Sequence, residues 1–300
     1  MILYHYEMSP YAEKVRAMFG YTNTSWQSVL VPPMPPRKGL DALTGGYRRI
    51  PVAQQGADLF CDTGIICDEI AAQNNNQDLS LYSCDEAVAD YSRRIEREYF
   101  FASVASVPSK VLLKKLLKYH SIITGFKLLR DRAKMRKASS VRMPGAARSV
   151  KLFNEQLHAL EEKLEHAFLF GEHPTFADFS AYHHLWFYHE LGAQPLPDEV
   201  RQVSAWFERM HAFGRGERDE KPIRYALAQA SQHEPRVIDE AMQSPNVGCD
   251  ITIQPNDYAQ DSVSGRVVGE GPNRWIIARD TAQYGKVHVH FPKEGYAAAL

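Results

Sequence analysis

In the first 75 residues, segments whose hydrophobic pattern is typical of strands take turns with segments whose pattern is typical of helices. Strands are predicted at residues 1–6, 25–31, 50–53 and 59–61, and helices from Pro10 onward and over residues 63–72. Strands that alternate with helices in so short a stretch indicate an α/β unit. We therefore place a first domain at residues 1–76.

A polar linker at residues 74–84 leads to a segment with helical periodicity. Leu152, Leu157, Leu160 and Leu164 share one face of a long amphipathic helix. Further on, Thr175 and Asp178 have the spacing of a capping box, with Asp in place of the usual Glu or Gln. Both are expected to be structural, each contributing about 1 kcal/mol as a cap. We predict an all-helical second domain over residues 84–232.

The tail, residues 245–300, has the pattern of short strands separated by Gly, Pro, Asn and Asp. Four strands are predicted, at residues 251–253, 263–268, 275–277 and 287–291. They indicate a small β-rich extension that packs on the chain or embraces a second copy of it. His288 and His290 share one strand face, but no third ligand is evident, so no metal site is predicted.

Charge is balanced over the whole chain and unbalanced in one segment. The formal net charge of −1 gives no overall attraction to nucleic acid or to anionic lipid. Between Lys110 and Lys151, however, there are thirteen lysines or arginines and a single acid, Asp131. A solvated helical surface is the default interpretation. Contact with an anionic substrate or a membrane surface is an alternative, and nucleic acid is disfavoured because no recognised binding module accompanies the charge.

Targeting and redox signals are weak. The N-terminus shows no features of a signal peptide, and no apolar run approaches the roughly 18 residues needed to span a bilayer. The four cysteines show no CxxC spacing and no dense disulfide framework. A reducing, cytoplasmic location is expected.

Four short motifs occur in a fixed order. Ser9-Pro10-Tyr11 follows the first predicted strand, Arg49-Ile50-Pro51 opens a later one, Asp62-Thr63 begins the last helix of the first domain, and Thr175-Phe176-Ala177-Asp178 lies in the helical segment. In order and spacing this set resembles the glutathione S-transferase family. The Ser-Pro-aromatic start is most similar to the serine-type classes such as tau, and to the omega pattern with Ser in place of Cys. The resemblance covers about residues 1–230.

The resemblance implies a thioredoxin-like α/β N-terminal domain followed by an all-α domain, here with the β-rich extension. It also implies glutathione as a co-substrate and Ser9 as the catalytic residue that stabilises its thiolate. A free thiol has a pKa near ~8.5, so lowering it by about two units takes roughly 2.7 kcal/mol of preferential stabilisation. A hydroxyl donor and a helix N-terminus can together supply that amount. The alternative is that Ser9 only caps the helix.

The remaining glutathione-binding residues also follow from the resemblance. The backbone of Ile50, before a cis Pro51, would pair with the cysteinyl part, and Asp62 with Thr63 would hold the γ-glutamyl end. Arg49 would pair with the glycyl carboxylate, although Arg48 and Lys38 are alternatives. Tyr11 joins this set and would face the electrophile. The hydroxyls of Tyr4, Tyr6 and Tyr11 are the alternatives to Ser9 as donor to the thiolate. Serine cannot form a mixed disulfide, so thiol exchange is disfavoured.

The predicted function is therefore transfer of glutathione to a small hydrophobic electrophile, as in detoxification, by a homodimer. Isomerase, peroxidase or dehalogenase chemistry would use the same thiolate. The alternative is a non-catalytic module of the same fold that binds glutathione, hydrophobic ligands or a protein partner, because fold alone does not fix function.

Overall fold

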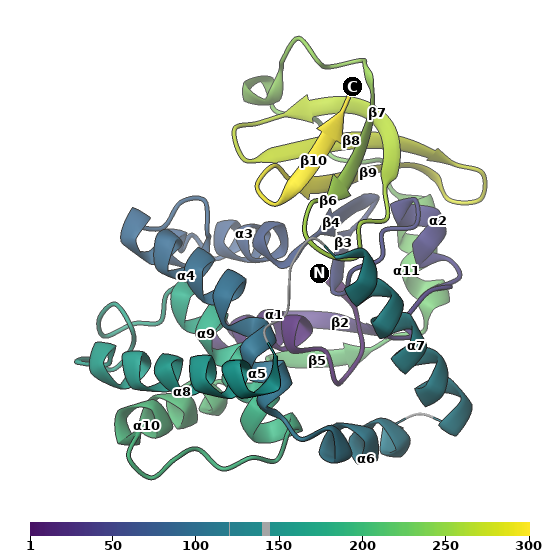
Figure 1. The fold of residues 1–300 in the computed structure, drawn as a ribbon. Coiled ribbons are helices and arrows are strands. Elements are labelled where there is room, and N and C mark those ends of the chain that lie inside the picture. Colours follow the sequence, from purple (N-terminus) through teal and green to yellow (C-terminus); the bar gives the residue numbers. More distant parts are fainter. Residues whose placement is uncertain (120, 140–144) are drawn as a thin grey trace.

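One mixed β-sheet joins the beginning and the end of the chain (Figure 1). The computed structural model describes residues 1–119, 121–139 and 145–300. Within them ten strands form this sheet, in the order β10-β6-β7-β8-β9-β4-β3-β1-β2-β5. The predicted tail strands thus continue the sheet of the first domain.

The N-terminal unit forms the middle of the sheet. Its elements are β1 (Ile2–His5), α1 (Pro10–Tyr21), β2 (Ser25–Leu30), α2 (Leu40–Thr44), β3 (Val52–Gln55), β4 (Asp58–Cys61) and α3 (Thr63–Gln73). β1 runs parallel to β2 and antiparallel to β3, and β3 pairs antiparallel with β4. All the predicted elements of this unit are present, and α1 starts at Pro10 directly after its N-cap Ser9.

Alternate side chains of these strands enter two separate cores. Leu3 and Phe60 pack with α1, α3 and the helical segment, whereas Tyr4 and Leu59 pack with α2, α11 and the tail. The strands are apolar on both faces because both faces are covered, which explains why their sequences are almost continuously hydrophobic.

The second segment is mainly helical. It contains η1 (Gln77–Leu79), α4 (Glu86–Glu98), α5 (Phe100–Ser106), α6 (Ser109–Tyr119), α7 (Ile122–Ala138), α8 (Ala146–Lys163), α9 (Phe176–Trp186), η2 (Phe187–Leu191), α10 (Arg201–Ala212) and α11 (Ile223–Gln232). The capping box of Thr175 and Asp178 is present at the start of α9. No helix in the described parts of the chain is long and apolar enough to cross a membrane.

The prediction that residues 84–232 are all helical is wrong at one point. β5 (Glu217–Glu220) pairs in parallel with the edge strand β2, and Trp26 donates to the carbonyl of Arg215 at 2.7 Å. The sequence Glu-Arg-Asp-Glu carries no strand signal, because this strand is held by backbone pairing with an exposed edge and not by buried side chains.

The tail contains β6 (Asp250–Pro255), β7 (Val263–Glu270), β8 (Arg274–Thr281), β9 (Gly285–Pro292) and β10 (Tyr296–Ala299), preceded by η3 (Glu240–Met242). The four predicted strands are present, but β10 was missed because its alanines favour helices. β9 pairs in parallel with β4 of the same chain, so the tail embraces its own N-terminal unit.

Ion pairs and polar contacts reinforce this junction. Arg274 binds the carboxylates of Asp68 and Glu69 at 2.7 and 2.5 Å, and His290 lies 2.8 Å from Asp58. His288 approaches the same aspartate at 3.9 Å. Both histidines therefore contact a carboxylate in the junction. In the described part of the chain no group of three or more His, Cys, Asp or Glu is placed to hold a metal.

Candidate active site at two adjoining cavities

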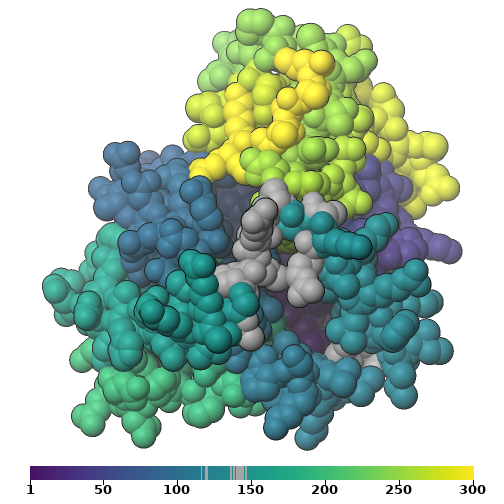
Figure 2. All heavy atoms as spheres, viewed as in Figure 1, coloured from purple at the N-terminus to yellow at the C-terminus, as the bar shows by residue number. Residues whose placement is uncertain are grey.

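Two cavities meet where the N-terminal unit, the helical segment and the tail come together. Purple atoms of the N-terminal unit are visible at the bottom of hollows between the tail and the α4–α7 region (Figure 2). The first cavity has a volume of about 490 Å³ and the second about 610 Å³. These volumes are in the range of small-molecule sites. Tyr11, Arg49, Ile50, Phe101 and Tyr258 line both cavities, which therefore share a wall.

The structure brings all the predicted binding residues together. Tyr11, Arg49, Ile50, Pro51, Asp62 and Thr63 line the first cavity. They come from three places in the sequence that lie up to 52 positions apart. The Ile50-Pro51 peptide bond is cis, as the resemblance implies.

Ser9 is placed differently. Its Oγ accepts the backbone N–H of Ala12 at 3.2 Å, its exposed fraction is 1%, and it lines neither cavity. The neighbouring Pro10 and Tyr11 do line the second cavity. Ser9 is thus an N-cap directly behind the cavity wall.

Asp62 combines an unusual backbone conformation with a partly buried charge. Its φ is +83°, a conformation that non-glycine residues rarely adopt and that is concentrated at functional sites. One carboxylate oxygen accepts the N–H of Gly64 at 3.0 Å and the other accepts the hydroxyl of Tyr296 at 3.1 Å. Burial raises the pKa of Asp62, although Arg49 and the Gly64 N–H oppose the shift. A bound cation would therefore stabilise this carboxylate further.

Thr63 follows as the first residue of α3. Its side chain lines the first cavity, at the end of the helix where backbone N–H groups are unpaired. Such a helix end attracts anionic groups. Asp62 and Thr63 together present a carboxylate and a helix N-terminus, which suits a ligand end that carries both an ammonium and a carboxylate.

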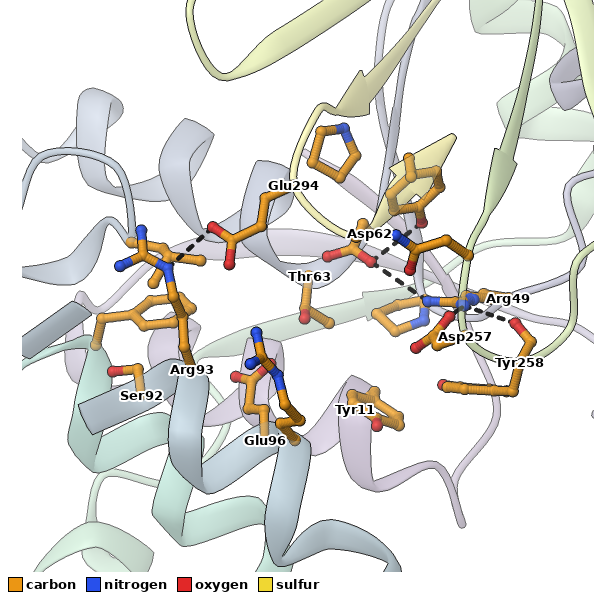
Figure 3. A pocket seen from close by; sticks show the side chains of 18 of the residues that line it. Tyr11, Arg49, Asp62, Thr63, Ser92, Arg93, Glu96, Asp257, Tyr258 and Glu294 are labelled. Atoms are coloured by element: carbon orange, nitrogen blue, oxygen red, sulfur yellow. Dashed lines mark hydrogen bonds and ion pairs between the residues drawn. The ribbon is translucent and has the colours of Figure 1, made fainter. Parts of the chain in front are cut away.

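Arg49 is already surrounded by acceptors from its own chain. It pairs with Asp257, donates to the carbonyl of Tyr258 at 2.6 Å and lies 3.9 Å from Asp62. Its guanidinium also stacks over the ring of Tyr258, 4.3 Å from the centroid. Figure 3 shows these groups gathered round Arg49. A ligand carboxylate that used Arg49 would compete with Asp257.

The tail and α4 also line the first cavity, and no sequence motif predicts their contribution. Asp257, Tyr258, Glu294 and Tyr296 of the tail line the first cavity, and so do α4 residues of both charges, Arg93, Glu96 and Arg97. The Arg93 side chain binds Glu294 at 2.9 Å and so links α4 to the tail (Figure 3). No local motif marks these residues, because they meet across about 200 positions of sequence.

Glu96 belongs to a polar network between the N-terminal unit and the helical segment. It pairs with Lys14 of α1, whose side chain is fully buried, and accepts the hydroxyl of Ser180 at 2.7 Å. Burial alone would raise the pKa of Glu96, but the Lys14 ammonium and the Ser180 hydroxyl lower it below its usual value. Glu96 therefore presents a fixed negative charge to the first cavity.

Comparisons with known proteins agree with this geometry. The model of the glutathione S-transferase N-terminal domain matches residues 3–78, and that of the C-terminal domain matches residues 136–212. Together the two models cover more than half of the chain. A search of curated proteins gave no significant match.

Among solved structures, the chain is similar to a GST-like protein from Pseudomonas syringae. The two share 28% identity and a TM-score of 0.79 over 99% of this chain and 98% of that one. A glutathione S-transferase domain-containing protein from Marinobacter aquaeolei VT8 is 19% identical with a TM-score of 0.51, over 71% of this chain and 98% of that one. The chain belongs to the glutathione S-transferase family and has the fold of that family extended by a β-rich tail.

Proposed function

We propose that the chain is a glutathione transferase, with the tripeptide in the first cavity and an electrophile in the second. One observation carries this proposal: the six predicted residues all line the first cavity, and that cavity shares a wall with the second, more apolar cavity. A reaction between two bound molecules needs this arrangement, because it holds the thiol and its target in adjoining positions.

In this proposal each end of glutathione has a partner. The γ-glutamyl ammonium and carboxylate are bound by Asp62 and by the N-terminus of α3 at Thr63. The backbone of Ile50 pairs with the cysteinyl part, and the glycyl carboxylate takes the place of Asp257 on Arg49. This placement directs the thiol toward the shared wall, where Tyr11 stands.

Asp257→Asn tests the role of Arg49. The change removes a competing carboxylate, so glutathione is expected to bind about fivefold more tightly, equivalent to roughly 1 kcal/mol. Calorimetric titration would measure the affinity. Glutathione esterified at the glycyl carboxylate is the matched control and should show no gain. Unchanged or weaker binding of free glutathione would assign that carboxylate to another cation.

Ser9 is the proposed thiol donor. Its oxygen accepts the Ala12 N–H, and that arrangement leaves the hydroxyl hydrogen available to a ligand sulfur. A thiolate there would also lie at the positive end of α1. Because Ser9 is buried, glutathione would reach its hydroxyl only after a small shift of the cavity wall.

Ser9→Ala is expected to raise the pKa of bound glutathione by about one to two units and to lower turnover about tenfold to a hundredfold. Glutathione affinity should stay nearly unchanged. Ultraviolet titration of the thiolate in the complex measures the pKa directly. Ser9→Thr keeps the hydroxyl and the cap and is the matched control; Tyr11→Phe tests the nearest rival hydroxyl.

A second candidate is a non-catalytic module that binds glutathione or hydrophobic ligands. The burial of Ser9 and its absence from both cavity walls favour it. Glutathione binding without turnover of any generic electrophile, and without a thiolate signal that depends on Ser9, would select this candidate over the enzyme.

A cellular location and an oligomeric state are proposed as well. All four cysteines are unpaired, as a reducing cytoplasmic compartment would keep them. We propose a homodimer from the family membership.

A further inference from the structure

The charged residues that line the second cavity are all arginines. They are Arg37, Arg48, Arg49 and Arg132, and no aspartate or glutamate is among the described residues that line it. The rest of the wall is largely apolar, with Met8, Phe100 and Leu129 among its members. The first cavity differs, because four acids line it beside its three arginines.

Arg37 is the buried member of this group. Its exposed fraction is 2%, and its side chain donates hydrogen bonds to the carbonyls of Pro32, Arg48 and Pro33, at 2.8, 2.8 and 3.3 Å. No carboxylate within the described residues forms an ion pair with it. Burial lowers the pKa of Arg37 to about 10; Asp41 opposes the shift, and the charges of Arg132 and Arg48 add to it.

Two of the guanidinium groups converge on one atom. The carbonyl oxygen of Pro33 accepts from Arg37 at 3.3 Å and from Arg132 at 3.1 Å. Three acids lie just outside this cavity and do not line it: Asp131 pairs with Arg48 and lies 4.0 Å from Arg132, Asp261 lies 3.8 Å from Arg48, and Asp41 accepts the backbone N–H of Arg37 at 2.6 Å. Among the described residues, the charged groups of the cavity wall itself are therefore cations.

Gathering like charges around a partly buried space is unfavourable unless an anion offsets their repulsion. Planar guanidinium groups bind carboxylates through paired hydrogen bonds. Beside these cations, the apolar wall favours a hydrocarbon or aromatic body. The ligand that suits both features has an apolar body and a single carboxylate head.

We propose that the second cavity binds an apolar molecule bearing one carboxylate, whose head group is held by Arg37 and Arg132. If the chain is a glutathione transferase, this anion is its electrophile; only that last step rests on the proposed function. Arg49 and Arg48 are left out of the head-group site because each already has two carboxylate partners. Asp257 and Asp62 contact Arg49, and Asp131 and Asp261 contact Arg48.

Binding is tested first, without glutathione. Octanoate and octanamide have the same hydrocarbon body and differ in charge, and calorimetric titration measures each. Octanoate is expected to bind at least about tenfold more tightly, since a charge-assisted hydrogen bond is worth about 1.5–3 kcal/mol. No binding of octanoate, or equal binding of the two, would overturn the proposal.

Two variants of α7 locate the site. Arg132→Gln removes a cavity-lining cation that is 43% exposed and should not disturb folding. It is expected to weaken octanoate binding about fivefold and to leave octanamide unchanged. Lys134→Gln removes the same charge from the same helix outside the cavity and is the control. Equal losses in both variants would indicate general attraction to the basic segment and would contradict a specific head-group site.

The reaction is tested separately with 4-chloro-3-nitrobenzoate and 4-chloro-3-nitrobenzamide. The glutathione thiolate forms a carbon–sulfur bond and chloride leaves with the electron pair of the carbon–chlorine bond. After correction for the uncatalysed rates, kcat/KM should favour the benzoate, and Arg132→Gln should remove the preference. Preferential octanoate binding without any conjugation would uphold the carboxylate site and count against the transferase.

Discussion

Replacing Asp178 by alanine is expected to lower the free energy of unfolding by about 3–5 kcal/mol. Its fully buried carboxylate accepts the N–H groups of Leu169 and Thr175, at 2.9 and 2.8 Å, the Thr175 hydroxyl at 3.1 Å and the Trp206 indole N–H at 2.9 Å. The substitution leaves these donors buried and unpaired. Urea denaturation followed by circular dichroism measures the loss.

Thr175→Ala is the matched control, because it removes one donor and its half of the capping box. This variant should lower the free energy of unfolding by about 1 kcal/mol. A cost for Asp178→Ala no larger than that would mean that Asp178 is only a cap. The capping-box spacing predicts only that role, because nothing local relates Asp178 to Trp206, which lies 28 positions further along.

Deleting residues 245–300 is expected to prevent folding to a soluble protein. The tail supplies Val267, Ile277, Val289 and Phe291 to the second core, each with an exposed fraction of 0%. At about 1.5–3 kcal/mol per side chain, their loss is comparable to the whole stability of a typical domain, about 5–15 kcal/mol. The deletion also leaves the β4 edge unpaired, which favours aggregation.

Soluble yield, elution volume and Tm would measure this effect. The control is deletion of residues 297–300 alone, which are exposed and form most of the outermost strand. That variant should fold normally. A chain lacking residues 245–300 that stays monodisperse, with Tm within a few degrees of the full chain, would show that the tail is a separable appendage, as the strand pattern alone suggests.

The elements that could be predicted from the sequence depend on local signals. Ser9-Pro10 marks the start of α1, and runs of strand-forming apolar residues mark the strands beside which the proposed binding residues lie. The resemblance then assigned Asp62 and Thr63 to one site, and both line the first cavity.

What could not be predicted depends on pairing between distant segments. The register of β4 with β9 joins Asp58 to His288, and Arg49 meets Asp257 across 208 positions. β5 has no apolar face, because backbone pairing with the otherwise unpaired edge of β2 holds it in place. In each case the stabilising partner lies far outside the window in which periodicity, capping and turn residues can be recognised.

The parallel pairing of β4 with β9 also constrains how the protein is made. β4 ends at Cys61 and β9 ends at Pro292, so the partner of β4 is synthesised 231 residues later. At about 5–20 residues per second, ribosomes need roughly 10–50 s for that stretch. During this interval the nascent N-terminal unit has an unprotected sheet edge, and the first cavity lacks the wall that Asp257 and Tyr296 of the tail supply.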